Sequence, residues 1–287
     1  MLEKKILKLK GNQNVSYIDE GNVSSPVVLL VHGFPESSLI WKEIVPKIVS
    51  LGYRAIAPDL PGFGHSDQFN IPSTWENYRQ FVSNFLEKLK VDHVHLFCHD
   101  WGAIISLFWA GEHPEKILSL FVTDTIFAPD AEWHELAKFF RTPQIGEMTV
   151  EKLFSTRESF ERLMKSGFPT ITDELLDEFY STFLTPEGRN IPLELYRSGD
   201  FKKIEKGKLL QIQKPATIVW GENDIACPLN FAHQIRDNEI PQATIHTIPN
   251  VGHFVPYEAA EEVNKVVELH FVKVQSKVKG GVSEWKM

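Results

Sequence analysis

An aspartate stands between two apolar segments in the stretch CHDWGAII, residues 98–105. A predicted strand, then C-H-D-W-G, then an apolar helix is the layout of a nucleophile elbow, where a catalytic side chain sits on a sharp turn. Asp100 takes the nucleophile position and Gly102 that of the second glycine, while Cys98 replaces the first. The N-terminus of a helix stabilises an anion. An aspartate after a strand is also a common helix N-cap, so its partners must decide its role.

A possible catalytic set with Asp100 is completed by two other residues, both of which lie much later in the chain. Asp224 lies in WGENDIACP, after one predicted strand, and His253 lies in VGHF, after the next. A nucleophile, then an acid, then a histidine is the chain order expected around such an elbow. In that set the acid orients the histidine and stabilises its cationic form. We therefore expect Asp100, Asp224 and His253 to act together.

The loop HGFPESS, residues 32–38, follows an early predicted strand and would face the nucleophile. The backbone N–H groups of Phe34 and Trp101 would then form an oxyanion hole, although a simple strand-to-loop turn is the alternative. The segment DLPGFGHSD over 59–67 contains G-x-G, but no helix that could cradle phosphate opens there. We expect no nucleotide and no other cofactor.

The segments that position these residues alternate between short apolar runs and helical patterns. One helix is predicted over 75–90, where Phe81, Phe85 and Leu89 recur at four-residue spacing. This alternation predicts an α/β fold with a mostly parallel sheet and helices on both faces. The predicted strands are 27–32, 54–59, 94–99, 118–124, 216–221 and 243–248.

The alternation breaks after Asp124. Residues 126–205 show helical fragments over 131–140, 149–165 and 172–184, separated by turn-forming residues. We expect a helical cap over 126–205, inserted into one α/β core formed by 1–125 and 206–275. The alternative is that these helices are additions to the main domain. The Lys- and Gly-rich residues 276–287 are predicted to be a flexible tail.

These motifs resemble the α/β-hydrolase superfamily, and specifically its aspartate-nucleophile branch of epoxide hydrolases and haloalkane dehalogenases. HGFPE, PDLPGFGHSD, HDWG, WGENDxxxP and GHF occur in the family's order between about residue 15 and residue 272. The resemblance implies the α/β-hydrolase fold and a small apolar substrate, which Asp100 attacks to form an alkyl ester. His253 would activate the water that cleaves the ester. Some members carry the third acid at the position of Asp124, which is the alternative to Asp224.

The resemblance leaves two leaving groups open. A halide would take an indole N–H from Trp101, but the second donor of that family is missing, because Phe34 follows His-Gly. An epoxide oxygen needs an acid from the cap, and Tyr196 resembles one of the usual pair of tyrosines, with Tyr180 or His134 as the other donor. We expect an epoxide hydrolase, with a haloalkane dehalogenase as the alternative. A non-catalytic binding protein with the same fold is the alternative of another class.

Aromatic residues of the cap are expected to form the apolar wall of the substrate pocket, which would exclude water from Asp100. The candidates are Phe127, Trp133, Phe139, Phe140 and Phe168.

The amino-acid composition limits the kinds of partner that the protein is expected to bind. The chain has 30 Lys and Arg against 38 Asp and Glu, a formal net charge of −8 that disfavours nucleic acid. It has 2 cysteines and no spaced Cys/His cluster, so we expect neither a disulfide framework nor a metal site. The sequence shows no signal core and no apolar run near the ~18 residues of a membrane span. We expect a cytoplasmic monomer or homodimer that contacts neither a membrane nor nucleic acid.

Overall fold

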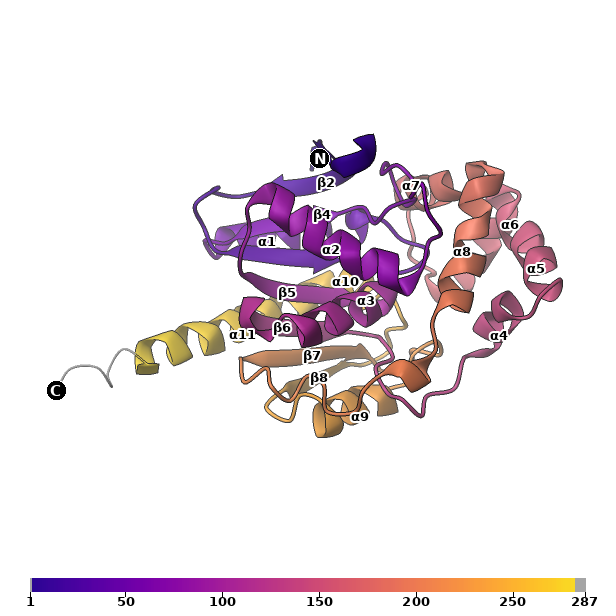
Figure 1. Ribbon diagram of the computed structural model, residues 1–287. Coiled ribbons are helices and arrows are strands. Elements are labelled where there is room, and N and C mark those ends of the chain that lie inside the picture. Colours follow the sequence, from indigo (N-terminus) through magenta and orange to yellow (C-terminus); the bar gives the residue numbers. More distant parts are fainter. Residues whose placement is uncertain (1, 282–287) are drawn as a thin grey trace.

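A sheet of eight strands forms the centre of the protein in this computed structural model, which describes residues 2–281 (Figure 1). The strand order is β1-β2-β4-β3-β5-β6-β7-β8, with β2 antiparallel to both β1 and β4 and all other neighbours parallel. The strands are β1 Lys4–Lys8, β2 Asn14–Glu20, β3 Val27–Val31, β4 Arg54–Pro58, β5 Val94–His99, β6 Ile117–Thr123, β7 Ala216–Gly221 and β8 Thr244–Ile248. The mostly parallel α/β sheet predicted from the sequence is confirmed.

Every residue of the central strands β3 and β5 is buried, as expected where helices cover both faces of a parallel sheet. The six predicted strands all form, whereas β1 and β2 were not predicted. Strand β1 is short and lysine-rich, which suits an exposed sheet edge but leaves little apolar pattern to detect.

Helices cover the two faces of this sheet in pairs. Helices α2 (Trp75–Leu89) and α3 (Asp100–Glu112) pack together in front of the sheet in Figure 1, and α1 (Val45–Ser50) packs with α11 (Ala260–Gly281). Helix α9 (Asn230–Asn238) lies against β7 and β8, and the short α10 (Val255–Glu258) precedes α11. The predicted helix over 75–90 thus forms as α2, with the hydroxyl of Thr74 capping its N-terminus.

Five helices between β6 and β7 pack on one another at the right of Figure 1. They are α4 Glu135–Arg141, α5 Ile145–Phe154, α6 Arg157–Gly167, α7 Asp173–Tyr180 and α8 Pro186–Ser198. Helix α8 was not predicted, because Pro186 and Gly188 suggested a turn. Proline suits the first helical position, and the N–H of Gly188 donates to the hydroxyl of the capping Thr185, so these residues begin a helix instead.

The C-terminal segment differs from its prediction. Helix α11 continues through Gly281, so 276–281 are helical rather than part of a flexible tail, and 282–287 lie outside the described residues. The helix is anchored by Val267, Phe271 and Val274, which recur at helical spacing and are buried. In the described part of the chain, no helix is both long and apolar enough to cross a membrane.

Candidate active site

The turn between β5 and α3 holds Asp100 in a strained conformation. Its φ angle is +46°, in the left-handed region that side chains other than glycine rarely adopt. Two glycines make room for this turn. A Cβ atom at Gly102 would collide with the carbonyl oxygen of His32, and one at Gly33 would collide with the Asp100 carboxylate. Cys98, the unusual residue of the motif, is accommodated as a fully buried side chain.

The predicted catalytic residues meet at the carboxyl ends of the parallel strands. Nε2 of His253 lies 3.4 Å from Oδ2 of Asp100, and Nδ1 lies 2.8 Å from Oδ2 of Asp224. The other oxygen of Asp224 accepts 2.8 Å hydrogen bonds from the N–H groups of Ala226 and Cys227. These bonds hold the Asp224 carboxylate still, so that its second oxygen orients the imidazole.

The N–H of Phe34 donates a 2.7 Å hydrogen bond to Oδ1 of Asp100. This is one of the two oxyanion-hole donors expected from the sequence. It contacts the carboxylate oxygen that would bear the negative charge after attack on an Asp100 ester.

Asp124 follows β6 and lies beside this set of residues, without a hydrogen bond to His253. Its Oδ1 accepts a 2.9 Å bond from the N–H of Gly221, and its backbone carbonyl accepts one from the N–H of Asp100 at 3.2 Å. Full burial and the charge of Asp224 raise the pKa of the Asp124 carboxyl well above its usual range. Asp124 therefore favours its neutral form, and its two backbone hydrogen bonds hold the turn at Asp100.

The charges of Asp100 and His253 stabilise each other. Burial alone would raise the pKa of Asp100, but its hydrogen bond to His253 and the positive charge there bring that pKa below its usual value. Burial would lower the pKa of His253, but the charge of Asp224 and the bond to Asp100 raise it well above its usual value. Both shifts favour an imidazolium between two carboxylates.

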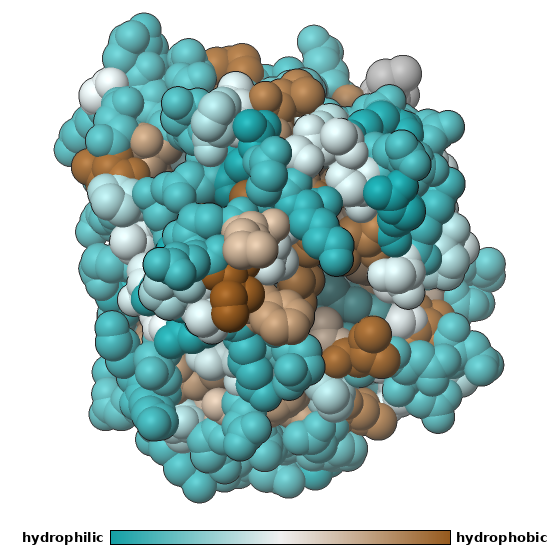
Figure 2. Space-filling view, turned by 90° about the vertical axis from the view of Figure 1, so that its right-hand side faces the viewer, coloured by the Kyte–Doolittle hydropathy of each residue, from teal (hydrophilic) through white to brown (hydrophobic). Residues whose placement is uncertain are grey.

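A cavity of about 330 Å³ opens above Asp100 and His253. Figure 2 views the cap end of the molecule, where hydrophobic side chains gather around a hollow. Aliphatic side chains from the cap and from the loop after β7 form much of the wall. They include Leu136, Leu163, Met164, Ile225 and Ala226.

Two neutral hydrogen-bond donors share this cavity with Asp100. Nδ1 of His134 accepts the N–H of Ala137 at 3.2 Å as the N-cap of α4, so the proton of the neutral ring lies on Nε2. Burial is the main cause that lowers the pKa of His134 and keeps it neutral. Burial also raises the pKa of Tyr196, with the Asp100 charge adding to it, so its hydroxyl keeps its proton. Both residues were predicted as donors from the sequence.

Three of the aromatic residues expected in the pocket lie elsewhere. Phe139 is 48% exposed on the outside of α4. Trp133 stacks on Phe201, with ring centroids 4.1 Å apart, and Phe127 packs against Phe108 at 5.3 Å. Amphipathic patterning identifies such residues as apolar but does not tell a cavity wall from the packing between elements.

The remaining aromatic candidates pack around the cavity without lining it. Phe168 stacks on the lining residue Phe254, with centroids 4.6 Å apart. The ring of Phe140 packs edge-on against that of Phe34, with centroids 6.2 Å apart. Three further aromatic rings of the cap also pack edge-on against Phe34. Tyr180 is not a cavity donor, because its hydroxyl donates to a backbone carbonyl just after α5.

Trp101, the expected halide donor, is also outside the cavity wall. It is 3% exposed and packs edge-on against Tyr196, with ring centroids 4.7 Å apart.

A second buried pair, Glu36 and His99, was missed in the sequence. Oε1 of Glu36 lies 2.9 Å from Nε2 of His99, and Oε2 accepts the N–H of Gly33 at 2.9 Å. Both side chains are fully buried, and the imidazoles of His99 and His253 lie 5.0 Å apart. Ionisable residues inside the motifs HGFPE and HDWG were the available signal, because such groups are buried only with partners.

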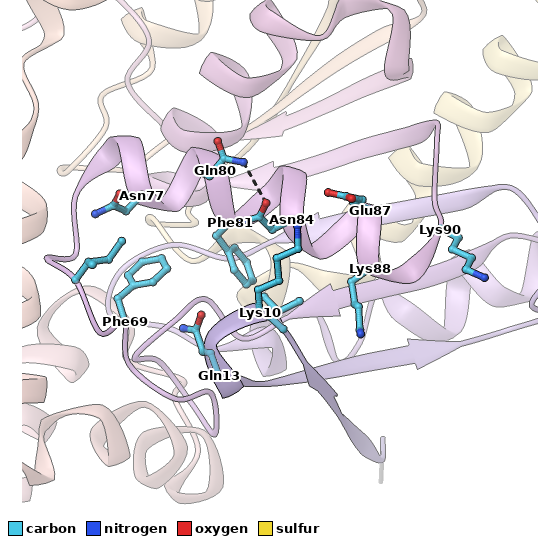
Figure 3. A pocket seen from close by; sticks show the side chains of 12 residues that line it. Lys10, Gln13, Phe69, Asn77, Gln80, Phe81, Asn84, Glu87, Lys88 and Lys90 are labelled. Atoms are coloured by element: carbon cyan, nitrogen blue, oxygen red, sulfur yellow. Dashed lines mark hydrogen bonds between the residues drawn. The ribbon is translucent and has the colours of Figure 1, made fainter.

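A larger hollow of about 520 Å³ lies beside α2, away from the triad (Figure 3). Its rim carries a hydrogen bond from Gln80 to Asn84, together with the exposed lysines Lys10, Lys88 and Lys90. None of its lining residues contacts Asp100, His253 or Asp224 through a hydrogen bond among the described residues. The smaller cavity above Asp100 is therefore the candidate active site.

A mostly parallel sheet with an aspartate at the strand-to-helix turn, and an acid and a histidine at the same carboxyl edge, has the layout of an α/β hydrolase. The chain belongs to the alpha/beta hydrolase fold family, whose family model matches residues 26–260, and it is an enzyme of the hydrolase class.

The chain is similar to named proteins over most of its length. It is 28% identical to a haloalkane dehalogenase of Psychrobacter cryohalolentis over 269 residues, 88% of this chain and 86% of the relative. A haloalkane dehalogenase structure from Bradyrhizobium elkani superposes with a TM-score of 0.82 at 21% identity, covering 96% of this chain and all (100%) of that one. A structure from a study of epoxide hydrolases in hot-environment metagenomes superposes with a TM-score of 0.78 at 21% identity. The match covers 94% of this chain and 99% of that one. At these identities the two structures support the fold alone.

Proposed function

We propose that the protein hydrolyses the bond between a saturated carbon and its leaving group in a small apolar molecule, with Asp100 as the nucleophile. The observation that carries this proposal is the carboxylate of Asp100 at the base of an apolar cavity, held by the Phe34 N–H and facing His253. An oxygen of Asp100 attacks the carbon. The bond to the leaving group breaks with its electron pair, and an alkyl ester on Asp100 results.

The second step frees the enzyme. Esterification removes the negative charge of Asp100, so His253 loses one of the two anions that raise its pKa. Its imidazolium then releases a proton to solvent, and the neutral ring becomes a base. It takes a proton from water, and the resulting hydroxide attacks the carbonyl carbon of the ester. The Phe34 N–H stabilises the oxyanion, Asp224 stabilises the imidazolium, and the alcohol leaves with one proton.

Alkyl halides are the first substrate class to be considered. The relative that matches 88% of this chain is named a haloalkane dehalogenase. This similarity favours alkyl halides over epoxides, whereas the sequence motifs favoured epoxides. A halide leaves with its electron pair and needs no proton, so an anionic nucleophile and a dry cavity are the main requirements.

Epoxides are the second candidate, favoured by the donors His134 and Tyr196 in the cavity wall. The oxygen of an opening epoxide becomes an alkoxide, which an N–H or O–H donor must stabilise or protonate. A halide gains little from a tyrosine hydroxyl as an acid.

A matched pair of four-carbon substrates tests both classes. We would incubate the purified protein with 1-bromobutane and with 1,2-epoxybutane, and measure bromide by ion chromatography and diol by gas chromatography. Bromide release identifies a dehalogenase, and diol formation identifies an epoxide hydrolase. Asp100→Asn is the control for background hydrolysis. No product and no covalent adduct from a wider panel of both classes would contradict the proposal and favour the binding protein.

A further inference from the structure

A second nucleophilic side chain lies beside the catalytic residues, and the proposed reaction does not use it. Cys227 is 3% exposed in the loop after β7. Its backbone is fixed on both sides, because its N–H donates to Asp224 at 2.8 Å and its carbonyl accepts the indole N–H of Trp220 at 2.7 Å. The backbone of Cys227 is therefore held beside Asp224.

The thiol completes a set of three metal-binding groups. The ligand atoms of Asp224, Cys227 and His253 all lie within 4.8 Å of one another, and all three residues are buried. A carboxylate oxygen, a thiolate sulfur and an imidazole nitrogen are the ligands that zinc binds in proteins. Local sequence spacing did not reveal the set, because His253 lies 29 residues after Asp224.

The pair of His253 and Asp224 requires only a small adjustment to hold a metal ion. Nδ1 of His253 and Oδ2 of Asp224 are 2.8 Å apart. Two such ligands of a tetrahedral zinc ion lie about 3.3 Å apart, so they must separate by roughly 0.5 Å. His253 and Ala226 both line the cavity above Asp100. A metal ion can therefore reach the site through that cavity.

The surrounding charge also suits a cation. Asp100 and Asp224 face His253 from two sides, so two carboxylates lie beside the position of the ion. A divalent ion would displace the proton that Nδ1 of His253 shares with Asp224 and the proton of the Cys227 thiol, and both protons would pass to solvent.

We propose that Asp224, Cys227 and His253 form an inhibitory binding site for a soft divalent cation such as Zn²⁺. Metal binding at this site takes His253 away from its proton-transfer role. The binding stands on the ligand geometry alone, whereas the inhibition rests on the proposed function of His253.

Cadmium titration tests the binding without any substrate. Cd²⁺ bound to a thiolate gives an ultraviolet charge-transfer band, and we expect one equivalent per chain to produce it. Cys227→Ser should abolish the band and weaken Cd²⁺ binding by roughly tenfold or more. Cys98→Ala is the matched control, because it removes the other buried thiol and should leave both readouts unchanged. Circular dichroism of each variant checks that the fold is kept.

Two outcomes would overturn the site: no thiolate band in the wild-type protein, or equal Cd²⁺ affinity in Cys227→Ser. A second measurement addresses inhibition with whichever substrate is turned over. Zn²⁺ should inhibit the wild type and Cys98→Ala, a chelator should restore activity, and Cys227→Ser should resist. Binding that leaves turnover unchanged would refute the inhibitory role, and it would leave the metal site itself intact.

Discussion

The imidazole of His253 lies 3.4 Å from the carboxylate of Asp100, and each group raises the preference of the other for its charged form. This mutual stabilisation links the two halves of the proposed reaction. When Asp100 becomes a neutral ester, the imidazolium is stabilised by Asp224 alone. In the proposed reaction, His253 therefore favours its cationic form before attack and acts as a base after it.

Asp100→Asn should lower the pKa of His253, because it removes one of the two neighbouring anions while keeping the side-chain shape. Titration of the imidazole by NMR measures this pKa directly. Asp124→Asn is the matched control, since the raised pKa of Asp124 favours its neutral form, and it should leave the pKa of His253 nearly unchanged. An equal shift in both variants would contradict this account of the charges.

His253→Gln should slow turnover by roughly 10²–10⁴-fold and leave the alkyl ester on Asp100, because no base remains to activate water. Intact-protein mass spectrometry after incubation with an accepted substrate detects the ester. Asp100→Asn should show no added mass under the same conditions. If His253→Gln turned over without accumulating an adduct, ester cleavage would not depend on this histidine.

Tyr196→Phe separates the two substrate classes. It removes the hydroxyl of a residue that lines the cavity, so kcat for an epoxide should fall by about 10²-fold, while bromide release from 1-bromobutane should change little. The measurement compares kcat and KM for both substrates. His134→Gln should act in the same direction, because it replaces the second neutral donor. Equal losses with both substrates would indicate a packing role instead.

Asp124→Asn should stabilise the protein in a pH-dependent way. The folded state keeps a proton on Asp124 that the unfolded chain releases above about pH 4. The contribution of this carboxyl to stability is therefore complete below that pH and is lost as pH rises toward its folded pKa. Asparagine stays neutral and still accepts the N–H of Gly221. The variant should match the wild type in Tm near pH 4 and exceed it at neutral pH, as differential scanning fluorimetry would detect.

Two buried histidines predict a loss of stability in mild acid. Burial lowers the pKa of His95 to about 4 and that of His270 to about 3, and both bond to the hydroxyl of Ser119. The unfolded chain takes up these protons near pH 6.5. Their contribution is therefore present above that pH and is lost as pH falls, by up to about 1.4 kcal/mol per pH unit for each group.

His270→Gln should flatten the dependence of Tm on pH between 7 and 4.5, as a series of thermal melts would measure. The control is His113→Gln, at a partly exposed site on the surface. A slope as steep as that of the wild type would exclude His270 as a cause.

The positions of Asp100, Asp224 and His253 at strand ends were visible in the sequence, because each follows a recognisable apolar strand. The choice between Asp224 and Asp124 was not visible. Both follow strands, and only the conformation of the loop after β7 turns the Asp224 carboxylate toward His253. Parallel strands bring their carboxyl ends together, but they do not specify how the connecting loops turn.

The cap was harder to predict, for a related reason. The apolar character of Phe139 and Phe140 was evident, yet the first is exposed and the second packs on Phe34. Which face of α4 meets the core depends on the neighbouring helices, which a single helix pattern does not describe. Helix α8 went unpredicted because residues typical of a turn also start helices.

Phe34 belongs to two parts of the molecule at once. Its backbone N–H donates a hydrogen bond to the carboxylate of Asp100. Its ring packs against aromatic side chains of the cap, including Phe140 and Tyr196. If the cap moved outward to admit or release a molecule, the packing of its aromatic side chains on the Phe34 ring would change. Through Phe34, the position of the cap helices and the alignment of the Asp100 carboxylate are therefore coupled.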